Sequence, residues 1–468
     1  MFGSPYSLRY FDECPLLLQA YTEDPFAQEL AAQSLFGACD LQGKLPVTAC
    51  DSAVFGQGIQ KTYAHKRLGY DLPEAVGMNS DTLATMEDIV QELINSGAAP
   101  GCQILVAKDN KVVWFKAYGY QTYDQTVPMS TETIFDLASV TKVAATTISA
   151  MKLVEQGRIN LDSAMSCYVP ELRSTNKKSL TVREIMAHHA GLQPWIPFYK
   201  ATLENGLPDA HIYHREQDAD SEVPVAPGMY MDNAWVDSIW QQIFRSELRE
   251  DKNYKYSDLD LYLTARAISN LSGERLDRFA DRQYYRPLGL ATTTFNPWQK
   301  GLTLRCAPTE EDRYFRQQRL QGYVHDMGAA MLGGVSGHAG LFSNANDLCK
   351  IFQMLLNGGA YGNTTFLKPE TVQTFTTRFA RSTRRGIGFD MKELNEKESQ
   401  NVSALAGPNT FGHTGFTGIG VWADPDKNLI FIFLSNRTYP TMENNKLISG
   451  DYRPKLQSVV YRAMKQKQ

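Results

Sequence analysis

The stretch GHTGFTGIGVWADPDKNLIFIFLSNR, residues 412–437, predicts a β-hairpin. Residues 416–425 and 429–437 are rich in β-branched and aromatic residues, and Asp-Lys-Asn supplies the turn between them. A second apolar pair, at 102–120, surrounds an Asp-Asn turn. Because strands occur near both ends of the chain, we expect one sheet closed by the two ends, with a helical insertion at about 160–395.

Bulk composition narrows the class of protein. The chain has 468 residues, of which 43% are hydrophobic and 21% charged, as in a globular protein with a sizeable core. A net charge of −4 gives no basic surface, so we expect no nucleic acid partner. No stretch reaches the roughly 20 apolar residues of a membrane helix. The opening, MFGSPYSLRYF, lacks the charged and apolar regions of a signal peptide, so these residues leave the compartment open.

The N-terminal part of the chain predicts a small separate unit. Within residues 1–50, an apolar run at 16–21 suits a strand, and 25–37 has the proline start and glycine stop of a helix. This α/β fragment is too short for a core of its own. Residues 51–78 are rich in glycine and polar residues and are interpreted as a linker. The main domain then occupies 79–468.

Ser-x-x-Lys occurs three times, so its surroundings decide which copy is functional. The chemistry requires a lysine amine one helical turn after a serine whose proton it can take. The serine also gains from a helix N-terminus, where free N–H groups can hold an oxyanion. Ser139, followed by Lys142, opens the helical segment SVTKVAATTISAMKLVEQG and meets both demands. The other copies lie in that helix's interior and in a polar loop: Ser149–Lys152 and Ser174–Lys177.

Two further motifs carry candidate chemistry. Tyr256-Ser257-Asp258 precedes the helical pattern LDLYLTARAISNLSG, and a tyrosine at such a turn can act as a general base if cations lower its pKa. Another Tyr-x-Asp occurs at 230–232, so the motif alone is weak. His413 begins a His-x-Gly that leads directly into a strand, whose small residues and backbone groups allow close contact with a substrate.

The remaining patterns are less informative. Two other His-x-Gly sequences begin at His189 and His338, and we expect both to be turn residues near the site at most. The eight histidines show no metal-ligand spacing, and the glycines at 333–337 are not followed by the Lys-Ser/Thr of a phosphate loop. We therefore expect no metal and no cofactor. Nothing in the spacing of the candidate paired carboxylates supports glycoside chemistry beyond chance: Asp136, Asp258 and Asp326.

The order Ser-x-x-Lys, Tyr-x-Asp, His-x-Gly resembles the active-site set of the serine β-lactamase and penicillin-binding-protein family, which includes class C β-lactamases, D,D-peptidases and β-lactamase-like esterases. The resemblance covers residues 80–465 and includes the blocks LTVREIMAHHAGL at 180–192 and GYVHDMGAAMLGGVSGHAGLFSNANDL at 322–348. It implies a β-lactamase/transpeptidase-like α+β fold, in which an antiparallel sheet is flanked by helices and the site faces a helical subdomain.

The family's roles carry over motif by motif. Ser139 corresponds to the nucleophile that forms the acyl-enzyme, and Lys142 to the lysine that lowers the serine's pKa or takes its proton. Tyr256 corresponds to the tyrosine that passes the proton to the leaving group and activates the deacylating water. The backbone N–H groups of Ser139 and Phe416 form the implied oxyanion hole. The resemblance places the other motif residues in substrate binding: Asp258, His413, Thr414 and Gly415.

Two positions depart from the family pattern. The second motif usually ends in an asparagine, whose amide donates to a substrate carbonyl, whereas an ionised Asp258 only accepts. True β-lactamases have a lysine in the third motif, which attracts the substrate carboxylate, whereas His413 is neutral or partly charged near pH 7. Both changes disfavour efficient β-lactam hydrolysis. They favour the peptidase- or esterase-like branch, in which several members use His-x-Gly.

Residues 1–50 show a second resemblance, to the end of the α/β domain of family 3 glycoside hydrolases. FGSPYSLRYF, LLLQAYTEDPFAQELAAQSLFGA and GKLPV occur in the corresponding order. Such enzymes are sometimes fused to a β-lactamase-like domain in bacteria, so the resemblance implies a covalent fusion, with Met1 an artificial or secondary start. It also implies a periplasmic or cell-envelope location, because β-N-acetylglucosaminidases of cell-wall glycopeptide occur in that family.

Four functional hypotheses follow. The leading one is a serine hydrolase that acts on a small cell-wall-related D-amino-acid peptide, amide or ester. The alternative within the hydrolases is a carboxylesterase, and the preference between p-nitrophenyl esters and D-Ala-D-Ala peptides separates the two. A non-catalytic domain that binds peptidoglycan or regulates an attached glycosidase is disfavoured by the three intact motifs. A glycosidase is disfavoured because the chain contains no barrel domain.

Overall fold

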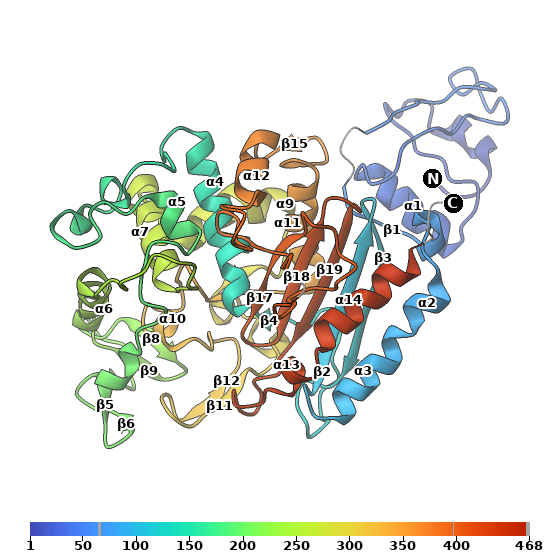
Figure 1. Ribbon diagram of the computed structural model, residues 1–468. Helices are drawn as coiled ribbons and strands as arrows, with labels where there is room; N and C mark the ends of the chain where they lie inside the picture. The colour runs from blue at the N-terminus through green and yellow to red at the C-terminus, as the bar shows by residue number, and fades with distance from the viewer. Residues whose placement is uncertain (64–66, 396, 465–468) are drawn as a thin grey trace.

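A seven-stranded sheet forms the centre of the computed structural model, which describes residues 1–63, 67–395 and 397–464. All neighbouring strands are antiparallel except the first two, which are parallel. The expected α+β fold, with a sheet closed by the two chain ends, is confirmed, although one edge makes the sheet mixed. In order across the sheet (Figure 1), the strands are β1 (Gly69–Tyr70), β3 (Lys111–Gly119), β2 (Gly101–Lys108), β19 (Leu429–Ser435), β18 (Ile419–Asp424), β17 (Phe411–Gly415) and β16 (Asp390–Met391).

The central strands β2 and β19 are buried on both faces. Every residue of β19 is buried, and in β2 only Lys108 is partly exposed. This explains why their apolar runs are continuous instead of alternating. The β2–β3 hairpin turns at Asp109 and Asn110, whose φ angles of 51° and 66° lie in the left-handed region that tight hairpin turns require. The turn expected there from the sequence is therefore confirmed.

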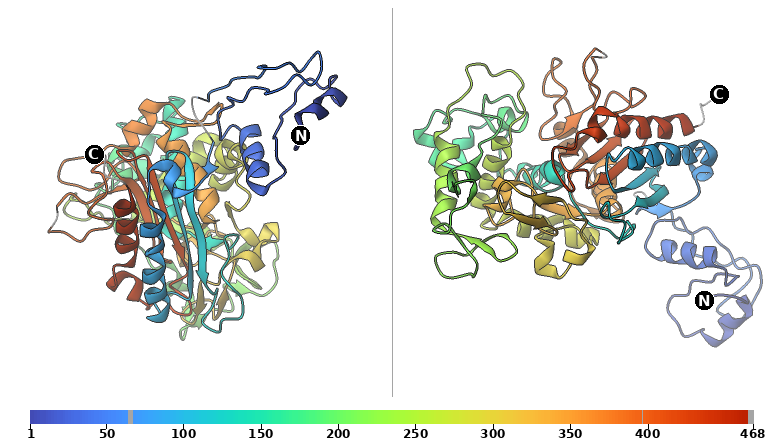
Figure 2. Two further views of the ribbon diagram at one scale, coloured as in Figure 1. Left: turned by 90° about the vertical axis from the view of Figure 1, so that its right-hand side faces the viewer. Right: turned by 90° about the horizontal axis from the view of Figure 1, so that it is seen from below.

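Three helices cover one face of the sheet, as the side view in Figure 2 shows. In the helix at residues 86–95, Met86, Val90 and Leu93 are buried and recur at the spacing of one helical face. These residues pack against the side chains of β2 and β19 on the same face of the sheet. The resulting core is separate from the larger core on the opposite face. The three helices are α2 (Ser80–Ala84), α3 (Met86–Asn95) and α14 (Tyr452–Ala463).

The opposite face of the sheet packs against α11 (Ala345–Leu356) and the rest of the helical part, which encloses the larger core. The other helices of this part are α4 (Ile148–Glu155), α5 (Val182–Met186), α6 (Ala234–Arg245), α7 (Leu259–Ser272), α8 (Leu276–Ala280), α9 (Arg286–Leu288), α10 (Met327–Ala330) and α12 (Pro369–Thr376), and α13 (Lys446–Ser449) precedes α14.

Short strands join the loops of the helical part. The most important for the site is a three-stranded group of β10 (Thr294–Phe295), β13 (Leu341–Ser343) and β4 (Phe135–Asp136), because β4 leads into Ser139. The others are β7 (Tyr213–His214), β9 (Met229–Met231) and β8 (Val223–Ala226); β11 (Glu310–Asp312) and β12 (Gln318–Leu320); β5 (Leu203–Glu204) and β6 (Leu207–Pro208); and β14 (Ala360–Tyr361) and β15 (Thr364–Thr365).

The N-terminal segment extends away from the body of the molecule (Figure 2). Its helix α1 (Pro25–Leu35) is confirmed, and Asp24 caps it by accepting the N–H of Ala27 at 2.9 Å. The strand expected at 16–21 is wrong: only an isolated bridge from Ala20 to Phe2 forms there. An apolar run needs a partner strand and a covering layer to become a sheet strand, and Leu16 has neither, being 70% exposed. No helix of the described residues is long and apolar enough to cross a membrane.

Candidate active site

The backbone presents Ser139 from a strained turn. Ala138, directly before it, has a φ of 43°, a conformation that costs a residue with a side chain about 1–3 kcal/mol. Asp136 holds this turn, because its Oδ1 accepts the N–H of Ala138 at 2.8 Å and its Oδ2 accepts that of His325 at 2.6 Å. A 3₁₀ turn and then a π-helical turn, Lys142–Thr147, follow before α4 begins. Ser139 is thereby left half-buried at the start of the helical segment, as expected.

Lys142 is fully buried beside the serine. Its Nζ donates to Ser139 Oγ at 2.9 Å and to the carbonyl oxygen of His338 at 3.0 Å, and it lies 2.7 Å from Asp258 Oδ1. Burial alone would lower the pKa of Lys142, but the charge of Asp258 raises it above its usual value. His338, expected to be a turn residue near the site at most, thus contributes its backbone carbonyl to the lysine.

Tyr256 completes the group of side chains around Ser139. Its hydroxyl lies 2.9 Å from Ser139 Oγ, and the Lys142 ammonium lies 5.0 Å from the centre of its ring. Burial raises the pKa of Tyr256, and the nearby lysine only partly opposes this effect. The side chain is therefore a neutral phenol near pH 7. The cation-lowered pKa that the motif allowed is not found.

The third motif lies on the strand that borders this group. His413 sits in β17, where its Nδ1–H donates to the carbonyl oxygen of Thr414 at 2.6 Å and its Nε2 accepts from Arg385 at 3.3 Å. These two partners fix a neutral tautomer. Burial, reinforced by Arg385 and Lys142, holds the pKa of His413 well below its usual value. The histidine is therefore neutral, which was one of the two states expected.

Gly415 brings the end of β17 against the turn that carries the serine. A Cβ at this position would lie 2.5 Å from the carbonyl oxygen of Leu137, so only glycine allows this approach. Phe416 follows directly and is half exposed, with the Arg437 guanidinium 4.6 Å from its ring centre. This arrangement suits the oxyanion hole expected at the N–H groups of Ser139 and Phe416, which stays a prediction.

Arg385 is a site residue that sequence reasoning missed. It is only 3% exposed, and its guanidinium lies 5.1 Å from the ring centre of Tyr256. Its Nε donates to the Tyr254 hydroxyl at 3.0 Å and lies 3.6 Å from a carboxylate oxygen of Asp390. The residue comes from the loop before β16, which bears no motif. Only the edge pairing of β16 with β17 brings it to the site.

A second group missed from the sequence is a buried pair behind Tyr256. His188 Nδ1 lies 2.5 Å from Asp260 Oδ2 and also accepts the Ser257 N–H at 3.3 Å. Because this nitrogen accepts a backbone N–H, the proton of the pair belongs on the carboxyl. Burial agrees, since it raises the pKa of Asp260 and lowers that of His188 well away from their usual values. The His188 ring, 4.8 Å from that of Tyr256, packs the tyrosine in place.

The other Ser-x-x-Lys copies have no such arrangement. Ser149 is fully buried inside α4, and Lys152 donates to the carbonyl of Phe366. Lys177 is buried, donates to the carbonyl of Phe244 at 3.2 Å near the end of α6, and has its pKa lowered to about 8 by burial. Neither lysine contacts its serine, unlike Lys142 and Ser139.

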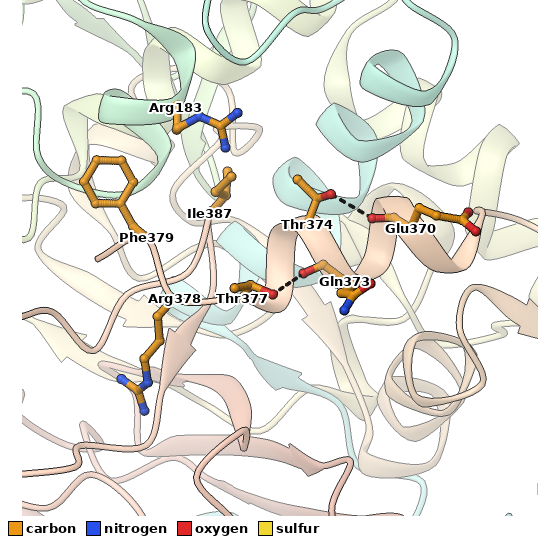
Figure 3. Close-up of a pocket in the computed structure, with 8 residues that line it drawn as sticks. All are labelled: Arg183, Glu370, Gln373, Thr374, Thr377, Arg378, Phe379 and Ile387. Carbon is orange, nitrogen blue, oxygen red and sulfur yellow. Dashed lines mark hydrogen bonds between the residues drawn. The ribbon is translucent and has the colours of Figure 1, made fainter. Parts of the chain in front are cut away.

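A cavity lined by described residues lies away from this group. Figure 3 shows this hollow of about 410 Å³ beside α12. Arg183 is already paired with Asp162 at 2.6 Å, and Arg378 donates to backbone carbonyls, so neither offers a free charge to a ligand. None of its lining residues is catalytic, and we assign it no role: Arg183, Glu370, Gln373, Thr374, Thr377, Arg378, Phe379 and Ile387.

A serine hydroxyl in contact with a lysine amine and a tyrosine hydroxyl, beside a strand that ends in glycine, defines a serine hydrolase of the β-lactamase/penicillin-binding-protein type. The chain belongs to that family, since the family model described as Beta-lactamase matches residues 86–449. A putative D-alanyl-D-alanine carboxypeptidase of Escherichia coli (strain K12) is 32% identical over 394 residues, which cover 78% of this chain and 85% of that protein.

Solved structures show the same fold. EstCE1, a hydrolase with promiscuous acyltransferase activity, matches with a TM-score of 0.59 and 19% identity over 81% of this chain and 99% of its own. A family VIII carboxylesterase matches with a TM-score of 0.57 and 17% identity over 83% of this chain and 99% of its own. At these identities the likeness concerns the fold alone.

Proposed function

We propose that the protein cleaves small D-amino-acid peptides through an acyl-enzyme on Ser139, as a D,D-carboxypeptidase does. The observation that carries this proposal is the position of Ser139 Oγ, 2.9 Å from both the Lys142 amine and the Tyr256 hydroxyl. The relative from Escherichia coli, named a putative D-alanyl-D-alanine carboxypeptidase, supports the peptide substrate.

The reaction proceeds in two acyl transfers. Ser139 Oγ attacks the scissile carbonyl carbon, and its proton passes through the Lys142–Tyr256 pair to the leaving amine as the C–N bond breaks. The oxyanion is held by the N–H groups of Ser139 and Phe416. Water then attacks the ester carbonyl, gives its proton back through the same pair, and releases the acyl group and Ser139.

The leaving side of the substrate carries a carboxylate in this proposal. His413 is neutral and cannot attract that charge, but Arg385 keeps a guanidinium against it at 3.3 Å. Thr414, partly exposed on the same strand, offers a hydroxyl beside it. The guanidinium and the hydroxyl together suit the carboxylate of a terminal D-amino acid.

Carboxylesterase activity is the second candidate. The chain shares its fold with a family VIII carboxylesterase, and an ester leaving group needs no anion subsite. A non-catalytic peptidoglycan-binding or regulatory role is the third. It is opposed by the intact hydrogen bonds of Ser139 with Lys142 and Tyr256, which a binding domain does not need.

The decisive experiment is intact-mass analysis after incubation with a p-nitrophenyl ester, followed by peptide mapping, with Ser139→Ala in parallel. We expect an acyl adduct on the Ser139 peptide and none in the variant, whose turnover falls about 10³-fold or more. Rates on a peptide ending in D-Ala-D-Ala and on p-nitrophenyl esters then separate the peptidase from the esterase. A folded wild-type protein with neither adduct nor turnover would leave the binding role.

The N-terminal segment is the subject of a separate proposal. We propose that residues 1–50 are the end of a family 3 glycoside hydrolase domain, joined through a linker at 51–78 to the hydrolase domain at 79–468, although Leu68 and β1 already pack in the body of that domain. Helix α1 supports this, because it buries none of its residues and leaves Phe26 74% exposed, as expected of a helix that packs on a larger unit. In the native source, a transcript or intact mass that begins at Met1 would refute the fusion. Cell fractionation tests the envelope location that the fusion implies.

A further inference from the structure

The charge state of Lys142 is set by the groups around its amine. The amine forms an ion pair with Asp258 Oδ1 at 2.7 Å and donates to Ser139 Oγ at 2.9 Å and to the carbonyl oxygen of His338 at 3.0 Å. A carboxylate and a carbonyl only accept hydrogen bonds, and an ammonium group has three N–H bonds to give. The ion pair with the Asp258 carboxylate and the bond to the carbonyl oxygen of His338 both favour the charged ammonium form of Lys142.

We propose that Asp258 is a positioning residue that keeps Lys142 an ammonium group during acylation, so that the Ser139 proton leaves through Tyr256 alone. The inference rests on the proposed function and specifies its proton path. Ser139 Oγ bonds to the scissile carbonyl carbon while its proton moves to the Tyr256 oxygen. The phenol proton moves to the leaving amine as the C–N bond breaks, and Lys142 keeps all its protons.

A proton relay through the Tyr256 hydroxyl is consistent with the neutral state of this side chain. A buried phenol that is protonated near pH 7 cannot start as a base, but it can accept one proton while it gives up another. Lys142 then stabilises the negative charge that develops on Oγ, through the hydrogen bond it already makes there. An asparagine at position 258, as in the usual motif, would leave the lysine without this anion.

No other described carboxylate lies within ion-pair distance of Lys142. Across the tyrosine, the charge of Arg385 is partly balanced by Asp390, and His413 is neutral because of its buried setting. Asp260, two residues after Asp258, is protonated through its contact with His188. The charged and titratable groups that face the lysine are therefore Asp258, Tyr256, Asp260, His188, Arg385 and His413.

The test compares pH profiles of kcat/KM for a p-nitrophenyl ester between wild type and Asp258→Asn. Loss of the anion lowers the pKa of Lys142, so the ammonium form disappears at a lower pH. We expect the basic limb of the profile to move down by about 1–3 pH units, the shift that an adjacent opposite charge produces. Asp258→Glu keeps the charge and should keep the limb near its wild-type position, even where kcat falls.

Asp260→Asn is the matched control, because it removes a neighbouring carboxyl that carries no charge, and its basic limb should not move. An unmoved limb in Asp258→Asn would show that Asp258 does not set the charge of Lys142, and faster acylation of this variant near pH 7 would show that Lys142 is itself the base. Either result would overturn the inference. The Ser139 adduct in wild type would still establish the proposed function. Failure of this inference can therefore be distinguished from failure of the proposed function. If Asp258→Asn does not fold, the nitrogen-15 resonance of Lys142 in wild type decides, since a neutral amine at pH 8 would contradict the inference.

Discussion

At the scale of single residues, Arg385 supplies a positive charge beside a third motif whose histidine is neutral. The position that carries a cation in true β-lactamases holds a neutral histidine here, and a guanidinium from another loop contacts that histidine instead. A positive charge therefore lies beside the site, but Arg385 supplies it in place of a lysine in the third motif. Charge requirements of a site can be met from any element that reaches it, so a motif alone does not reveal them.

Replacing Arg385 by alanine should lower the preference for substrates with a terminal carboxylate. A hydrogen-bonded ion pair contributes about 1.5–3 kcal/mol, or about 10- to 100-fold in kcat/KM. The measurement compares a peptide ending in D-Ala-D-Ala with the same peptide amidated at its C-terminus. The ratio of their kcat/KM values should fall, whereas Arg385→Lys should retain part of it.

An equal loss on both peptides would mean that Arg385 acts through Tyr256, on which its guanidinium stacks at 5.1 Å, and does not bind the carboxylate. The two peptides differ only at the terminal group, so a general loss of activity does not imitate the expected change.

Sequence reasoning found the residues that touch the nucleophile and missed those that surround them. Ser139 and Lys142 are one helical turn apart, so the contact between them is local and could be predicted. His188 and Asp260 are separated by 72 residues, and their contact follows from burial against Tyr256, which no local pattern encodes. The neutral state of Tyr256 was also missed, because desolvation depends on the packed surroundings.

At the scale of elements, the contact between β17 and the 3₁₀ turn at Ala138–Val140 sets the geometry of the oxyanion hole. Gly415 permits it, since any side chain there would meet the carbonyl oxygen of Leu137. Because Gly415 has no side chain, β17 can lie close to the turn that carries Ser139.

We expect Gly415→Ala to move β17 away from Ser139. The added methyl group would meet a backbone oxygen at 2.5 Å, and such overpacking costs about 1–3 kcal/mol of stability. We expect slower acylation of Ser139, measured by the rate of adduct formation, together with a lower midpoint of denaturant unfolding. Gly420→Ala on β18 is the control, because its Cβ would meet no backbone atom: its nearest neighbours are the side chains of Arg453, at 3.3 Å, and Trp422, at 3.7 Å.

Acylation at the wild-type rate in Gly415→Ala would show that the backbone absorbs the methyl group without displacing Phe416, and that the N–H of this residue does not hold the oxyanion. Slower acylation in both glycine variants would point to a general effect of the sheet.

Strands could be predicted where strong turn residues separate two long apolar runs. Both hairpins of the main sheet combine strong turn residues with long apolar strands, and both form as expected. The run at 16–21 has the composition of a strand but no covering layer, so it stays irregular. The two-residue strand β1 could not be predicted, because its parallel pairing with β3 depends on where the preceding chain passes.

At the scale of the whole molecule, the N-terminal segment lies outside the hydrophobic cores of the hydrolase body. Among the residues that the structure describes, the two hydrophobic cores begin at Leu68 and Met78. The segment touches the body through few groups, such as the Gln33 side chain, which accepts the N–H of Tyr70. The body therefore holds all the apolar packing that the site requires.

A protein without residues 1–50 should fold and keep its activity. We expect an unchanged kcat/KM on a p-nitrophenyl ester and a cooperative thermal transition close to that of the full chain. Loss of folding in the shortened protein would mean that the segment stabilises β1 and the sheet edge, and the boundary proposed at 50 would then be wrong.

The pairing of β2 with β19 also determines when the protein can fold. Asn428, next to β19, donates to Asp109, next to β2, across a separation of 319 residues. On the ribosome, β2 and β3 emerge early, yet their apolar neighbour exists only when synthesis is nearly complete. Until then the hairpin exposes a long, unpaired apolar edge, the kind of surface that chaperones bind. Any truncation that removes the last forty residues would leave a nascent chain with every catalytic residue present and no central strand to assemble them.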